Sequence, residues 1–391
     1  MVMSENNHIY LDNAATSFPK PEAVYAAVDH YNRHVGAAFG RSAYQSALEV
    51  QGTVNRCRKQ AAEFFGAESP ERIIFTFNGT DSLNLALHGL LKPGDHVVTS
   101  KIEHNSVLRP LRELRVRKEI DVSYLEADST GLIEPADVKA AIQPNTKLIT
   151  LIHASNVTGT IQPIADVGEI AHNADALFLV DAAQSAGHLP IDLRNLPLDL
   201  LACPGHKGLL GPLGTGLLYI RPGIEEKLCS IRQGGTGSQS EDDQQPETLP
   251  DKYESGNHNA PGLYGLEAAF GHLQERGIES IRAHEQQLTK QLLNGLSTIP
   301  NLELFGPKNI EEQVGVVSIS LPGFDPQVLS TILDENFSIQ TRAGLHCAPG
   351  VHKNIGTFET GGTVRLSTGQ FTSVEDIDAA VLAIREVAKA G

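Results

Sequence analysis

The fold of this chain is decided around residues 203–208, Cys-Pro-Gly-His-Lys-Gly, which lie between two strand-like runs. The run before them covers residues 198–203, and the run after them covers 217–220 and follows a glycine-rich turn. A lysine in such a loop can form a Schiff base with an aldehyde cofactor. Most lysines beside glycines are solvated loop residues, so the role of Lys207 depends on its neighbours.

Asp181 is the first of those neighbours. It ends the apolar run at 176–180, whose uninterrupted hydrophobic residues predict a buried parallel strand. Open α/β sheets bind ligands at the carboxyl edge of their strands, and we expect both Asp181 and Lys207 to reach that edge. Pyridoxal phosphate needs this pair, because a lysine holds its aldehyde and an acid keeps its ring nitrogen protonated. The alternative is that Asp181 is only a cap or turn residue.

The composition argues against several classes of protein. The 391 residues are enough for two domains, and 47 acidic against 31 basic residues give a net charge of −16, which argues against nucleic acid and anionic membrane surfaces as partners. The N-terminal residues lack the features of a secretory signal, and no apolar run is long enough to span a bilayer. The four cysteines, Cys57, Cys203, Cys229 and Cys347, are scattered, so we expect a cytoplasmic, reduced protein without a metal site.

From residue 70 onward the chain alternates strand-like and helix-like segments. Strands are predicted at 72–77, 96–100 and 147–152, and helices near 81–91, 105–117 and 163–173. This pattern is typical of a mostly parallel sheet with helices on both faces.

The pattern changes in the second half of the chain. Residues 234–245 have no periodicity and predict a surface loop. After Pro261, long helix-like segments, a strand at 314–321 and a closing helix at 373–388 predict a smaller α+β domain. We therefore expect a large α/β domain at 20–260 and a smaller domain formed by 1–19 and 261–391.

Two further segments follow strands of the predicted sheet. In residues 78–82, Asn-Gly-Thr-Asp-Ser, backbone N–H groups and the Thr80 hydroxyl can bind a phosphate at a helix N-terminus, although a capped helix start without a ligand is the commoner case. No nucleotide-binding glycine motif occurs. His104 follows the strand at 96–100, where an imidazole can stack on a flat ring and transfer protons.

The segment 341–349, Thr-Arg-Ala-Gly-Leu-His-Cys-Ala-Pro, carries a candidate nucleophile. Most single cysteines are inert small hydrophobes, but Arg342 and His346 supply cations that would favour a thiolate at Cys347. Arg365 lies on a predicted strand nearby and can bind a substrate carboxylate through its forked guanidinium, unless it only forms a surface ion pair.

These motifs, in this order, resemble those of the cysteine desulfurases, which are pyridoxal-phosphate enzymes of fold type I in the class V aminotransferase superfamily. The similarity runs from residues 10–16, Tyr-Leu-Asp-Asn-Ala-Ala-Thr, to the strand that carries Arg365. It implies a large domain with a mostly parallel sheet flanked by helices, a smaller α+β domain that carries Cys347, and a homodimer with active sites at its interface. The motif Arg-x-Gly-x-His-Cys-Ala at 342–348 is similar to the short-loop type, which includes selenocysteine lyases.

The resemblance also implies a role for each site residue. Lys207, Cys347 and His104 would be catalytic, with Lys207 bound to pyridoxal 5'-phosphate and Cys347 carrying a persulfide. The cofactor would be bound by Gly79, Thr80, Asp81, His104, Asn156, Asp181, Gln184, His206, Lys207 and, in the partner subunit's site, Asn257. The substrate would be bound by Ala14, Ala15, Asn156, Arg342 and Arg365.

The implied reaction converts L-cysteine to L-alanine, transfers the sulfur to Cys347, and passes it to an acceptor, which can be another protein. Two positions depart from the family: Pro204 stands where serine is usual, and Asn257 where threonine is usual. The alternatives are a selenocysteine lyase acting on L-selenocysteine, an aminotransferase, epimerase or kynureninase-like lyase of the same fold, and a sulfur-relay scaffold without catalysis.

Overall fold

The computed structural model describes residues 8–40, 42–117, 120–236 and 243–390, and its largest element is a seven-stranded sheet. The strands lie in the order β2 (Ile73–Thr76), β8 (Gly216–Ile220), β7 (Leu200–Pro204), β6 (Leu177–Asp181), β5 (Thr146–Ile152), β3 (His96–Ser100) and β4 (Asp121–Leu125). Of these strands, β8 runs antiparallel to both of its neighbours, and the others run parallel to one another. Six carboxyl ends therefore meet at one edge, and the predicted mostly parallel sheet is confirmed.

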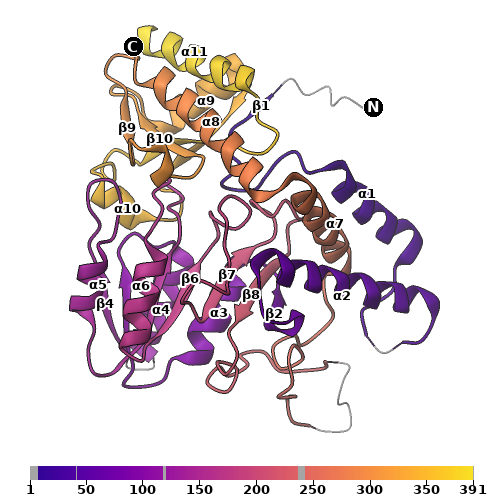
Figure 1. Cartoon of the computed structure of the whole chain (residues 1–391). Helices are drawn as coiled ribbons and strands as arrows, with labels where there is room; N and C mark the ends of the chain where they lie inside the picture. The colour runs from indigo at the N-terminus through magenta and orange to yellow at the C-terminus, as the bar shows by residue number, and fades with distance from the viewer. Residues whose placement is uncertain (1–7, 41, 118–119, 237–242, 391) are drawn as a thin grey trace.

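Helices cover both faces of this sheet (Figure 1). Successive side chains of a strand point to opposite faces, so Ile73 and Phe75 join one core cluster and Ile74 joins the other. The first cluster packs against α2 (Gln45–Phe65), α5 (Pro135–Ala141), α6 (Ile164–Asn173) and α7 (Ala260–Arg276), and the second against α3 (Gly79–Leu90) and α4 (Asn105–Arg117). The predicted layered α/β architecture is confirmed.

A smaller antiparallel sheet forms a second unit. Its strands lie in the order β12 (Arg342–Gly344), β13 (Thr363–Ser367), β10 (Val316–Ser320) and β9 (Glu303–Phe305). It shares a core with α8 (Ile278–Leu296), α9 (Pro326–Phe337) and α11 (Val374–Ala390). The start of the described chain belongs to this unit, because β1 (Ile9–Tyr10) pairs with β11 (Ile339–Gln340).

The division between the units differs from the predicted boundary at residues 260 and 261. Helix α7 packs against α2 and α1 (Glu22–His30), and its Leu266 and Phe270 are fully buried in the core of the larger unit. Gly277 separates α7 from α8 with a positive φ of 76°, which glycine adopts without strain. We propose that the smaller unit begins at α8, because the core of that unit starts there.

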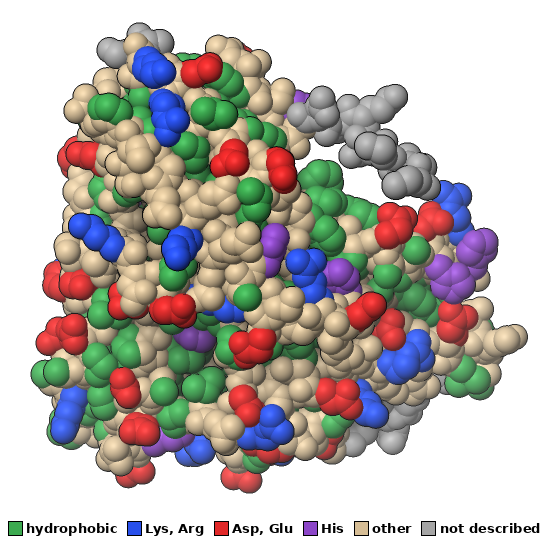
Figure 2. Space-filling model, turned by 45° about the horizontal axis from the view of Figure 1, so that its top comes forward, with side chains coloured by type: hydrophobic (Ala, Val, Ile, Leu, Met, Phe, Trp, Pro, Cys, Tyr) green, Lys and Arg blue, Asp and Glu red, His purple; other side chains and the backbone are tan. Residues whose placement is uncertain are grey.

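Some elements were not predicted from periodicity. The edge strand β4, Asp-Val-Ser-Tyr-Leu, alternates polar and apolar residues over only five positions, which is too short a pattern to separate from a loop. Of the predicted loop at 234–245, residues 237–242 lie outside the described part, and Gly234 N–H donates to Gln245 Oε1 at 3.1 Å across it. No described helix is long and apolar enough to cross a membrane. Figure 2 shows acidic and basic side chains interspersed on one face of the molecule.

Candidate active site

A cavity opens at the carboxyl edge of the large sheet, where successive strands end. Because the strands are parallel, residues far apart in the sequence reach the same edge. Eight of the predicted site residues line this cavity: Gly79, Thr80, His104, Asn156, Asp181, Gln184, His206 and Lys207. The structure therefore brings these eight predicted residues together in one cavity, and their distances could not be given by the sequence.

Lys207 and Asp181 supply the amine and the carboxyl group that line the cavity. Burial lowers the pKa of Lys207 to about 8, and Arg365 and Arg342 act in the same direction against the attraction of Asp181. Burial raises the pKa of Asp181, although the Ala183 N–H bond at 2.9 Å and the charge of Lys207 oppose the rise. Burial therefore outweighs the charge of Lys207 at Asp181, and a protonated ring nitrogen beside this carboxyl would lower its pKa.

His104 is a neutral ring at the cavity wall. Burial, followed by the charges of Lys207 and Arg342, lowers its pKa to about 4. The Ser106 N–H donates to His104 Nδ1 at 3.0 Å, so the remaining ring proton is on Nε2. The Ser106 hydroxyl lies 2.8 Å from the same Nδ1 and 2.7 Å from Thr80 Oγ1, and it links the ring to the start of α3. Ser106 was not among the predicted site residues.

The start of α3 is built to expose backbone N–H groups. Asn78 caps the helix by accepting from Asp81 N at 2.9 Å. A Cβ at Gly79 would lie 3.1 Å from Pro204 Cδ, so glycine allows the helix to approach the end of β7. The Asp81 carboxylate accepts from Phe77 N at 2.9 Å and pairs with Arg232, so Asp81 stabilises this turn and does not line the cavity.

Side chains of the segment before α1 donate hydrogen bonds to the backbone carbonyl oxygens of His206 and Lys207. Lys20 Nζ donates to His206 O at 2.8 Å and to Ser17 Oγ at 2.7 Å. Ser17 Oγ donates to Lys207 O at 2.9 Å, and Thr16 Oγ1 donates to His206 O at 3.1 Å. These contacts could not be predicted from the sequence, because 190 residues separate the two segments and only the fold brings them together.

The predicted substrate arginine is deeply buried. Arg365 is 1% exposed, donates to Asp12 Oδ1 at 2.6 Å and to Asn156 O at 3.0 Å, and its Nε has no partner among the described residues. Asp12 was not predicted as a site residue. Ala14 N–H donates to Ser367 Oγ at 2.9 Å, and the Ala14 carbonyl accepts from Gln184 Nε2 at 2.9 Å, so Ala14 and Ala15 lie on a segment joined to both units.

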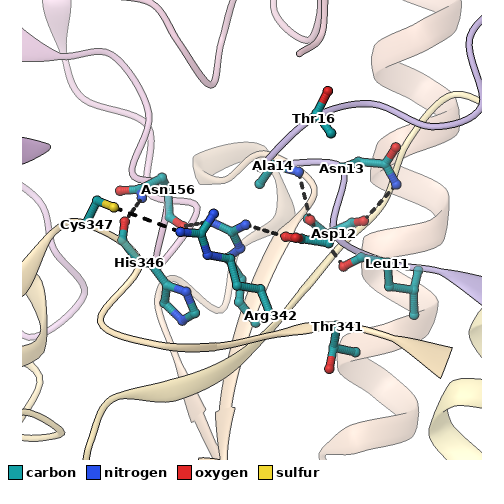
Figure 3. Close-up of polar contacts among 12 residues, drawn as sticks. Leu11, Asp12, Asn13, Ala14, Thr16, Asn156, Thr341, Arg342, His346 and Cys347 are labelled. Carbon is teal, nitrogen blue, oxygen red and sulfur yellow. Dashed lines mark hydrogen bonds and ion pairs between the residues drawn. The ribbon is translucent and has the colours of Figure 1, made fainter. Parts of the chain in front are cut away.

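Cys347 lies on a loop of the smaller unit next to Asn156 of the larger unit (Figure 3), and two residues of the larger unit bind this loop. Asn156 Nδ2 donates to His346 O at 2.6 Å, and Asn105 N–H donates to Cys347 O at 2.8 Å. His346 and Cys347 both have positive φ, at 48° and 59°, which costs free energy in residues other than glycine. The Cys347 side chain is exposed, and Arg342 Nη2 lies 3.9 Å from its sulfur.

The predicted cation at His346 is not present. Burial, followed by the charges of Arg365 and His352, lowers the pKa of His346 to about 2, so the ring is neutral. His346 Nε2 lies 3.1 Å from Thr363 Oγ1, and Figure 3 shows the ring turned away from Cys347. Arg342 is therefore the cation that the structure places at the sulfur.

Cys347 lines a hollow next to the Lys207 cavity. A second hollow, between α3 and α4, is lined by Cys347 and Arg109 together with Thr80, His104 and Ser106, which also line the first cavity. Asn257 is exposed in a different hollow beside Arg232 and does not join the other site residues in this chain.

Comparisons with known proteins agree with this geometry. The aminotransferase class-V family matches residues 9–380. A probable cysteine desulfurase of Methanothermobacter thermautotrophicus is 38% identical over 389 residues, covering 98% of this chain and 96% of that protein. A probable cysteine desulfurase of Pyrococcus abyssi is 35% identical over 387 residues, covering 97% and 94%. The apo structure of a cysteine desulfurase from Thermococcus onnurineus NA1 superposes with a TM-score of 0.90 at 34% identity, covering 99% of this chain and 96% of that one.

Proposed function

The chain belongs to the class-V aminotransferase family and, within it, to the cysteine desulfurases, and we propose that it binds pyridoxal 5'-phosphate between Lys207 and Asp181. It acts on L-cysteine, releases L-alanine and transfers the sulfur to Cys347. The observation that carries the proposal is that Cys347, from the smaller unit, lines a hollow that shares three residues with the cavity of Lys207.

The residues of the cavity fit this cofactor. The buried atoms Asn156 Oδ1 and His206 Nδ1 have no partner among the described residues, which is unfavourable unless a polar ligand satisfies them. We propose that Thr80, the first N–H groups of α3 and His206 hold the phosphate, and that Asp181 pairs with the ring nitrogen. Gln184 and His104 would contact the ring. Pro204 does not prevent this, because the exposed start of α3 remains available as a phosphate site.

The cofactor supplies an electron sink that stabilises negative charge at the substrate α-carbon. Lys207 Nζ, with a pKa lowered to about 8, exchanges its proton near neutral pH and is suited to move the α-proton. Asp181, as a buried negative charge beside the ring nitrogen of the cofactor, would favour the protonated form of that nitrogen. Arg365 orients the substrate carboxylate, for which its Nε is free.

Cys347 performs the sulfur transfer. Its thiolate attacks the sulfur of the substrate, so that an S–S bond forms and the Cβ–S bond breaks, with the electron pair left on carbon, which then takes a proton. Arg342 stabilises the negative charge on the attacking sulfur from 3.9 Å. The positive φ angles at His346 and Cys347 shape the turn of the loop that carries the thiol beside the hollow it lines.

A borohydride experiment tests the cofactor site directly. Reduction of the cofactor-loaded protein, followed by mass spectrometry of its peptides, should place the cofactor on Lys207, and Lys207→Ala should carry none. The matched control is Lys92→Ala, in an exposed turn, which should leave the modification unchanged. Attachment at another lysine would contradict the assignment. Alanine release from L-cysteine and from L-selenocysteine, measured side by side, separates a desulfurase from a selenocysteine lyase.

We also propose a cytoplasmic homodimer in which Asn257 of one protomer contacts the cofactor phosphate of the other. The exposed position of Asn257, outside its own cavity, supports this, and the four free cysteines suit a reducing compartment. Light scattering should give twice the mass of one chain. Asn257→Ala should weaken cofactor binding without changing that mass, and an unchanged cofactor affinity would contradict the contact.

A further inference from the structure

Helix α4 carries an unusual row of arginines on its solvent face. Arg109, Arg112 and Arg115 are exposed and follow one another at intervals of three residues, so they lie along one side of the helix. On the opposite side of the helix, Val107, Leu111 and other apolar residues are buried in the core. This row gives a concentrated positive charge to a chain whose net charge is −16.

The three arginines form no hydrogen bond or ion pair with any residue that the structure describes. Ten other arginines of the chain each pair with an aspartate or glutamate. On the described helix α4, four arginines face one carboxylate, that of Glu113, which pairs with Arg117 at 2.9 Å and lines the same hollow as Arg109. Unpaired, clustered positive charge raises the local concentration of acidic partners and speeds their association.

The row leads to the candidate nucleophile. Arg109 lines the hollow that contains Cys347, and Arg112 and Arg115 continue from it along the helix. Val116 lies among these arginines and is 76% exposed. Arginine is enriched at protein interfaces, and the exposed Val116 beside the row offers an apolar contact that a protein can use and a free anion cannot.

We propose that the arginine row of α4 (Arg109, Arg112 and Arg115) is the docking surface for an acidic protein whose thiol accepts sulfur from Cys347. This inference rests on the proposed function. In the transfer, the acceptor thiolate attacks the outer sulfur of the Cys347 persulfide; a new S–S bond forms, the old S–S bond breaks, and its electron pair returns to Cys347 as a thiolate. No external oxidant or reductant is needed.

The test uses cofactor-loaded protein and three short synthetic peptides, each with one cysteine flanked by glutamate, glutamine or lysine. Transfer of sulfur to the acidic peptide should be fastest, and added salt should remove its advantage. Reversing two charges, with Arg112→Glu and Arg115→Glu together, should slow transfer to the acidic peptide by roughly 10-fold. The same reversal should weaken binding of a fluorescent acidic peptide with serine in place of cysteine.

The control reverses the same number of charges elsewhere, with Lys290→Glu on α8 and Lys308→Glu before η3 (Ile310–Glu312), both exposed. It should leave both readouts unchanged. Alanine release with dithiothreitol as acceptor should be equal in all variants; a loss there would point to the proposed function or to folding. Equal rates for the three peptides, or an equal effect of the control, would overturn the proposal. So would a change of oligomeric mass in the α4 variant, which would make the row an interface between copies of this chain.

Discussion

Asn156 Nδ2 donates to the carbonyl oxygen of His346 at 2.6 Å, and this bond joins the cavity of the larger unit to the peptide before Cys347. Both groups are buried, and the next residue along the chain holds a positive φ of 59°. The position of Cys347 therefore depends on a side chain that also lines the Lys207 cavity.

Asn156→Ala should loosen the Cys347 loop. Loss of a buried hydrogen bond leaves the His346 carbonyl unsatisfied at a cost of about 1–3 kcal/mol, which allows the strained backbone to relax. Sulfur transfer to Cys347 should slow by roughly 10-fold, and the rate of Cys347 alkylation in cofactor-free protein should change. Asn354→Ala is the control, because its amide also bonds across the units, to Asp128 O at 2.6 Å. Equal alkylation rates in Asn156→Ala and wild type would contradict the positioning role.

Lys20→Met should weaken the attachment of the cofactor to Lys207. The Lys20 amine, whose pKa burial lowers to about 8, donates to the His206 carbonyl beside Lys207. Hydrogen bonds from charged groups contribute about 1.5–3 kcal/mol, so the dissociation constant should rise by roughly 10-fold or more. Fluorescence titration of the cofactor measures it, with exposed Lys92→Met as control. An unchanged constant would mean that Lys20 only packs.

Glu103→Gln should be more stable than wild type at alkaline pH. Burial raises the pKa of Glu103 to about 8, and the Ser100 hydroxyl donates to it at 2.6 Å. The folded state then binds more protons than the unfolded state between pH 4.5 and 8, so stability falls as pH rises through that window. Glutamine removes this penalty, by about 2–4 kcal/mol at pH 9. Urea unfolding of cofactor-free protein at pH 5 and pH 9 tests this, and equal differences at both values would refute it.

The buried pair of Arg58 and Glu254 should stabilise the segment that carries Asn257. Glu254 accepts from both guanidinium nitrogens at 2.6 and 2.7 Å and from Phe75 N at 2.6 Å. Although burial raises its pKa, Arg58 and His258 lower it to about 2. The folded carboxyl is thus the stronger acid, and its contribution is present above the unfolded pKa and is lost as pH falls toward 2.

Arg58→Ala should accordingly destabilise the protein by about 3–5 kcal/mol at neutral pH, because Glu254 remains charged and buried without its partner. The double variant Arg58→Met with Glu254→Gln should recover most of that loss. Thermal unfolding measures both, and a double variant less stable than Arg58→Ala would contradict the explanation.

The sequence predicted the sheet and most of the cavity for a simple reason. Parallel strands end at one edge, so residues that follow strands, such as Thr80, His104 and Asp181, meet there whatever their separation in the chain. Short motifs also carry Lys207 and Cys347. For these residues, local pattern and global topology give the same answer.

Other parts of the site could not be predicted because they depend on tertiary contacts. Ser17 and Lys20 donate hydrogen bonds to the backbone carbonyl oxygens of Lys207 and His206, which lie in a distant segment. A motif of side chains cannot predict bonds to backbone carbonyl groups. His346 was expected to be a cation because it adjoins Cys347, but its burial makes it neutral. Asp81 fits a phosphate motif in sequence and instead stabilises the turn before α3.

Transfer of sulfur to Cys347 is the central claim, and a single turnover without any acceptor tests it most directly. Cofactor-loaded protein is mixed with L-cysteine, and the peptides are analysed by mass spectrometry while alanine is counted. The account predicts one added sulfur on Cys347 for each alanine released, and neither product from Cys347→Ser. Alanine release by Cys347→Ser at the wild-type rate, or sulfur found on the exposed Cys229 instead, would contradict it.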